Sequence, residues 1–74
     1  MKEQITQLLD ELGWIDLGKQ KNPYMWSFLH EDSKTRMNIY HTTMTVTLQS
    51  PYVDPIKCES ATIKDITDMA NSIK

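Results

Sequence analysis

Residues 24–49 alternate between apolar or aromatic side chains and polar ones, and this alternation limits the possible folds more than any other feature of the chain. A two-residue period is typical of strands that are buried on one face, and β-branched residues, which favour strands, are frequent here. Polar residues at 31–34 and 42–43 interrupt the pattern and predict turns. We therefore expect three antiparallel strands that follow one another in a meander.

The alternation also predicts which residues lie opposite each other. If the first turn has four residues, Phe28 lies opposite Met37. Trp26 then lies opposite Ile39 on the same face, because side chains point alternately to the two faces of a strand. The second turn, whether tight or four residues long, also places Val46 opposite Ile39. Both hairpins thus put large apolar side chains on one face, which we expect helices to cover.

The opposite face of the predicted sheet carries little charge. Its side chains are those of Met25, Ser27, Leu29, Arg36, Asn38, Tyr40, Thr45, Thr47 and Gln49. A tyrosine and an arginine among uncharged residues are typical of an interface, whereas a simply solvated sheet face is the alternative. A small core often gains stability from a partner. We expect contacts with a partner protein or a second copy from Met25, Leu29, Arg36, Asn38, Tyr40, Thr45 and Thr47.

Helical periodicity flanks the predicted strands on both sides. Residues 2–12 carry an apolar stripe that ends before Gly13, a typical helix stop. That stripe consists of Ile5, Leu8, Leu9 and Leu12. A second stripe, within residues 60–73, consists of Ile63, Ile66, Met69, Ala70 and Ile73. Thr62 and Asp65 resemble a capping box at the start of this second helix, and Ser60 is the competing cap.

Two segments remain between these elements. Residues 14–18 could form a short additional strand, and residues 19–23 a polar loop. Residues 50–57 contain two prolines, which are not compatible with a central strand, and we expect a connection that crosses the edge of the sheet. Three apolar side chains would anchor this connection to the core, those of Tyr52, Val53 and Ile56. The predicted fold class is α+β: a three- to four-stranded antiparallel meander covered on one face by N- and C-terminal helices.

The size and composition of the chain limit its function. Seventy-four residues with a net charge of −2 predict one small domain, residues 1–74, with no general affinity for nucleic acid. Cys58 is the only cysteine, so no intramolecular disulfide can form, and a free thiol suits a reducing compartment. The polar N-terminal residues do not resemble a signal peptide, and no apolar run approaches a membrane span. We expect a soluble cytoplasmic protein.

Metal binding and catalysis find little support in the sequence. The two histidines, His30 and His41, fall at opposite ends of the predicted hairpin, roughly 20 Å apart. Zinc ligands lie within about 2.3 Å of one ion, so the histidines cannot share a site. Cys58 lies in no catalytic motif, and a small enzyme that uses it is the least favoured alternative. We expect no cofactor and no catalytic residue.

The predicted order of helix, meander and helix resembles that of double-stranded-RNA-binding domains. In these domains the basic N-terminal end of the last helix contacts phosphate. Here the corresponding residues 59–65 hold one lysine between acidic residues, and the first helix is acidic. The resemblance therefore extends to the fold and not to the residues that would contact RNA. A nucleic-acid site would depend on other residues, namely Lys19, Lys21, Arg36 and Tyr40.

These patterns predict a non-catalytic protein-interaction module. Such a module could be an adaptor or a small inhibitor of a larger complex, of the type that phages and mobile elements encode. Nucleic-acid binding is the alternative.

Overall fold

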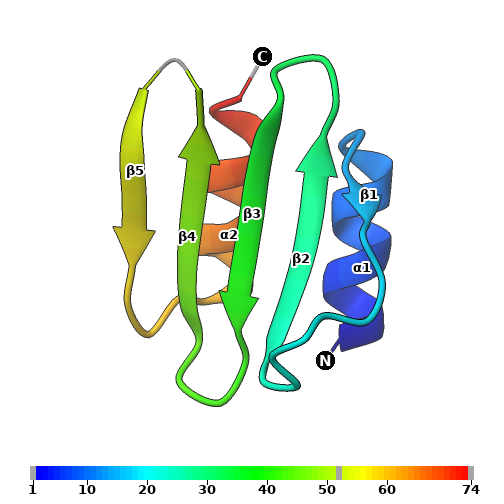
Figure 1. The fold of residues 1–74 in the computed structure, drawn as a ribbon, viewed down its shortest axis with the longest axis vertical. Helices are drawn as coiled ribbons and strands as arrows, with labels where there is room; N and C mark the ends of the chain where they lie inside the picture. The colour runs from blue at the N-terminus through cyan, green and yellow to red at the C-terminus, as the bar shows by residue number, and fades with distance from the viewer. Residues whose placement is uncertain (1, 52, 74) are drawn as a thin grey trace.

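The computed structural model describes residues 2–51 and 53–73, which form a five-stranded antiparallel sheet and two helices. Their order is α1 (Lys2–Glu11), β1 (Ile15–Asp16), β2 (Met25–His30), β3 (Thr35–Tyr40), β4 (Thr45–Ser50), β5 (Val53–Cys58) and α2 (Ile63–Asn71). Each strand pairs with the strand that precedes it, and both helices lie behind the same side of the sheet (Figure 1). The predicted α+β fold is confirmed, with one strand more than the three to four expected.

The predicted register of the central strands is confirmed. Phe28 pairs with Met37, and Ile39 lies between Trp26 and Val46. The second turn has four residues rather than two, because β3 ends at Tyr40 and β4 begins at Thr45. Both four-residue turns end in a left-handed residue, with φ of 55° at Lys34 and 53° at Met44. The left-handed residue returns the chain into the next strand without the glycine that a two-residue turn favours.

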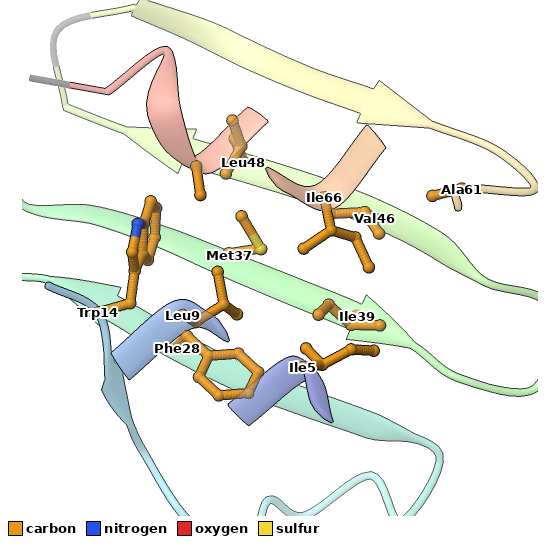
Figure 2. Close-up of a cluster of buried hydrophobic side chains, with 11 residues drawn as sticks. Ile5, Leu9, Trp14, Phe28, Met37, Ile39, Val46, Leu48, Ala61 and Ile66 are labelled. Atoms are coloured by element: carbon orange, nitrogen blue, oxygen red, sulfur yellow. The ribbon is translucent and has the colours of Figure 1, made fainter. Parts of the chain in front are cut away.

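The core lies between the sheet and the two helices (Figure 2). It contains Ile5 and Leu9 of α1, Ile66 and Ala70 of α2, Phe28, Met37, Ile39, Val46 and Leu48 of the strands, and Trp14 and Ala61 of the connections. Trp14 is only 1% exposed, and its Nε1 has no hydrogen-bond partner among the described residues. Trp26 is only partly buried and packs against the edge of this core.

The residues predicted to end α1 and to begin α2 form the expected contacts. Gly13 has a φ of 90°, and Trp14 N–H donates to the carbonyl of Leu9 over 2.8 Å, which ends α1. At α2, Thr62 N–H donates to Asp65 Oδ2 over 2.9 Å, and Asp65 N–H donates to Thr62 Oγ1 over 3.2 Å. This capping box confirms Thr62 as the N-cap in place of Ser60.

The prediction for residues 50–57 was wrong, because Val53–Cys58 forms the edge strand β5. Val53 and Ile56 do not anchor the chain to the core, since they are 58% and 49% exposed, and Tyr52 lies outside the described residues. Val53 pairs with Ser50, and Ile56 pairs with Leu48. The two residues between Val53 and Ile56 therefore oppose the single residue of β4 between Leu48 and Ser50. A proline is tolerated at such an irregularity on an edge strand. Figure 1 shows that α2 lies behind β3 and β4 and leaves β5 uncovered.

Only part of each apolar stripe of the helices is fully buried. Ile63, at the first position of α2, is exposed, whereas Ile66 and Ala70 are buried. Neither helix in the described part of the chain is long and apolar enough to cross a membrane.

Candidate functional site

The sheet presents one face that neither helix covers, and we call it the helix-free face (Figure 1). Its part on the three central strands consists of Met25, Ser27 and Leu29 of β2, Arg36, Asn38 and Tyr40 of β3, and Thr45, Thr47 and Gln49 of β4. On the outer strands, Ile15 lies opposite Leu29 and Lys57 opposite Thr47. The nine residues on the central strands pair as the alternation predicts, so all seven predicted contact residues lie on this face. Arg36 is the only charged residue among the nine.

A hydrogen-bonded network of polar side chains occupies the centre of this face. Ser27 Oγ donates to Asn38 Oδ1 over 2.8 Å, and Arg36 Nε donates to the same oxygen over 3.1 Å. Arg36 Nη2 also lies 3.3 Å from Ser27 Oγ. Ser27 and Asn38 are 0% and 6% exposed although no helix covers them. Their neighbours on the sheet therefore exclude water from them, and Arg36 offers the charged group at the surface of the network.

The network extends to the loop before β2. Arg36 Nη2 donates to Gln20 Oε1 over 3.0 Å, and Asn38 Nδ2 lies 3.5 Å from Gln49 Oε1. Gln20 Nε2 also donates to the carbonyl of Gly18 over 3.2 Å, which holds the loop in place. The contact between Gln20 and Arg36 could not be predicted, because a loop residue has no periodicity that would show where its side chain points.

The residues around the network are more accessible than its centre. Met25, Leu29, Tyr40, Thr45 and Thr47 are partly buried, and Gln49 is exposed. Tyr40 lies between Met25 and Thr45 in the register. The arrangement is a nearly uncharged surface with an aromatic ring at one end and a fixed guanidinium near the other, which can offer both apolar contact and directed hydrogen bonds.

The residues of the nucleic-acid alternative do not all come together. Lys19 and Lys21 are exposed on the loop on either side of Gln20, whose side chain contacts Arg36. Tyr40 lies four residues along β3 from Arg36, roughly 13 Å away. The loop that carries the two lysines is thus joined to Arg36 and not to Tyr40.

The other candidate side chains lie apart from the helix-free face. His30 Nδ1 is 2.8 Å from Ser33 Oγ at one end of the β2–β3 hairpin, and its ring packs against Trp14. His41 lies at the other end, with its backbone N–H bonded to the carbonyl of Tyr24 as the register predicts. Cys58 Sγ contacts the carbonyl of Glu59 over 4.0 Å. Within residues 2–51 and 53–73, no three His, Cys, Asp or Glu side chains lie where they could hold one metal ion.

An aromatic cluster lies near the start of β2, where the predicted register already pairs Tyr24 with His41. The rings of Trp26 and His41 are stacked, with centroids 4.5 Å apart and planes 17° from parallel. The centroid of the Tyr24 ring lies 6.4 Å from that of the His41 ring. The alternation assigned Trp26 to the covered face, but its position at the end of a strand leaves it only partly covered.

No family model, curated protein or solved structure matches this chain. The functional conclusion therefore depends on the chemistry of the surfaces described above.

Proposed function

We propose that this chain is a non-catalytic protein-interaction module that binds another protein, or a second copy of itself, through the helix-free face. The observation that carries the proposal is the network of Ser27, Arg36 and Asn38, because it orders a sheet face that has no covering layer. A guanidinium that is already held in place loses little side-chain entropy when a partner binds. Tyr40 adds an aromatic anchor of the kind that dominates binding energy at interfaces.

The uncharged character of the face favours a protein partner. Eight of the nine residues on β2, β3 and β4 carry no charge, so contact of this central part with another uncharged surface leaves few ions to desolvate. Met25 and Leu29 supply apolar area on β2. An adaptor or a small inhibitor of a larger complex would need such a surface and no catalytic group. A cytoplasmic location suits the free thiol of Cys58.

The substitution Tyr40→Glu tests this proposal, because it replaces the aromatic anchor of the face with a charge. Light scattering would give the molar mass of both proteins, and immobilised protein would test binding of candidate partners. We expect association to weaken about thirtyfold or more, as for an interface hot spot. Thr42→Glu is the matched control, since it adds the same charge to an exposed turn. Two results together would contradict the proposal. The wild-type chain would remain a monomer, and every protein that it binds would also be bound by the Tyr40→Glu variant.

The contact between Gln20 and Arg36 favours one second candidate, a nucleic-acid surface formed by Lys19, Lys21, Arg36 and Tyr40. That contact joins Arg36 to the loop that carries both lysines. Titration of labelled RNA and DNA at several salt concentrations tests this candidate, because phosphate contacts weaken steeply as salt rises. Absence of binding at low salt would exclude it.

A further inference from the structure

A hollow of about 250 Å³ lies beside the aromatic cluster, between the start of α1, the loop at residues 18–23 and the start of β2. Among its lining residues are Lys2, Lys19, Asn22, Met25 and Trp26. The lining thus draws on two lysines, two amide residues, a methionine and a tryptophan. The hollow adjoins the helix-free face, because Met25 lines it and because Gln20, which also lines it, accepts a hydrogen bond from Arg36.

The charge around this hollow is positive although the whole chain has a net charge of −2. No acidic residue is among the described residues that line it, and the sequence of residues 17–30 includes two lysines and no acid. Lys2 Nζ lies 3.8 Å from Asp16 Oδ2, so its charge is partly offset. Within the described residues, Lys19 forms no ion pair with an acidic side chain. Lys19 is therefore the cation that is free to bind an anion in the hollow.

The aromatic cluster gives the same hollow a stacking surface. Trp26 is one of the residues that line the hollow, and its indole stacks against His41, which fixes the orientation of both rings. The contact of 3.1 Å between His41 Nε2 and the carbonyl of Pro23 ties this pair to the loop. A flat ring held next to a free ammonium group suits a ligand with a flat π system and a negative charge.

We propose that this hollow binds one nucleotide unit, with its base against Trp26 and its phosphate at Lys19 and Lys2. Stacking on an aromatic ring tolerates any base, so the hollow accepts a free nucleotide or a nucleotide within a single strand. This inference does not rest on the proposed protein interface, because neither Arg36 nor Tyr40 lines the hollow.

Fluorescence of the two tryptophans provides the test, because Trp14 is buried in the core while Trp26 lines the hollow. The protein is titrated with adenosine 5′-monophosphate, with adenosine and with inorganic phosphate, and labelled oligothymidylate is followed by anisotropy. We expect the monophosphate to quench fluorescence more strongly than either fragment does. Trp26→Leu should weaken binding by at least about fivefold, and Trp26→Phe should restore most of it.

Lys19→Gln tests the phosphate contact separately. For the oligonucleotide, it should reduce the slope of log affinity against log salt by about 0.7, the value for one contact with a single strand. Lys34→Gln is the matched control, because Lys34 is exposed in the turn at the opposite end of β2. If the oligonucleotide binds more strongly than the monophosphate, the ligand is a single strand. If the monophosphate binds more strongly, the ligand is a free nucleotide. Absence of binding by either at low salt, or an equal loss in Lys34→Gln, would overturn the proposal, whatever the outcome for Tyr40→Glu.

Discussion

Ser27 and Asn38 face each other across β2 and β3 and share a hydrogen bond of 2.8 Å, on the one face of the sheet that no helix covers. Both side chains are buried, and Asn38 Oδ1 also accepts from Arg36 Nε. Polar groups buried in this way are stable only while their partners remain in place. The helix-free face is thus a defined structure even without a bound partner.

Asn38→Ala should lower the free energy of unfolding by about 1–3 kcal/mol, because it leaves the donors of Ser27 and Arg36 without their shared acceptor. Urea denaturation followed by circular dichroism measures the loss. Thr47→Ala, opposite Asn38 on the same face, is the control and should cost less than about 1 kcal/mol. Equal losses for the two variants would show that the network adds nothing to stability.

Phe28→Ala should cost about 3–5 kcal/mol, since the ring is buried in the core between the sheet and α1. A domain of this length has a total stability of about 5 kcal/mol, so the variant should be largely unfolded at 37 °C. Tyr24→Ala removes a ring that is more than half exposed and should cost less than about 1 kcal/mol. Thermal denaturation compares the two, and a folded Phe28→Ala variant would contradict the assignment of this face to the core.

The capping box predicts a dependence on pH. The backbone N–H and the hydroxyl of Thr62 donate to Asp65 and lower the pKa of its carboxyl below the ordinary value. Because the folded pKa is the lower one, the ionised carboxylate stabilises the fold above the unfolded pKa of about 3.9. This contribution is lost as the pH falls through the folded pKa.

Asp65→Asn should therefore be less stable than the wild type at neutral pH and should approach it as the solution becomes strongly acidic. Denaturation at a series of pH values measures the difference. Asp68→Asn is the control, because the pair of Asp68 with Lys64 is exposed and adds little to stability. A difference for Asp65→Asn that stays constant with pH would contradict this role of the carboxylate.

The edge strand β5 predicts a distinct mode of association. Pro55 has no N–H to donate and lies in the irregular part of the strand, and both features discourage pairing with another sheet. Pro55→Val should cause association that rises with protein concentration in light scattering, because exposed Val53 and Ile56 flank the new residue. Tyr40→Glu should not reverse it. If Pro55→Val leaves the molar mass unchanged at all concentrations, the proline does not protect this edge.

Much of the fold could be predicted because strand alternation and helix periodicity are local signals. The pairing of Phe28 with Met37 and of Ile39 with Val46 followed from side chains that point alternately to two faces. Gly13 and the pair of Thr62 and Asp65 marked helix ends through contacts between near neighbours in sequence. The membership of the helix-free face followed from the same alternation.

Only the tertiary structure decided what each face and edge contacts. The sequence by itself determined the two helices, the central meander and its register, since each depends on residues close together or on a two-residue period. It did not determine that β5 joins the sheet as an edge strand that α2 does not cover. Nor did it determine that Trp14 lies in the core. It also gave no indication that Gln20 reaches Arg36, sixteen positions later in the chain. Such contacts depend on how far each helix extends over the sheet and on how the loops fold back, and no local pattern records either.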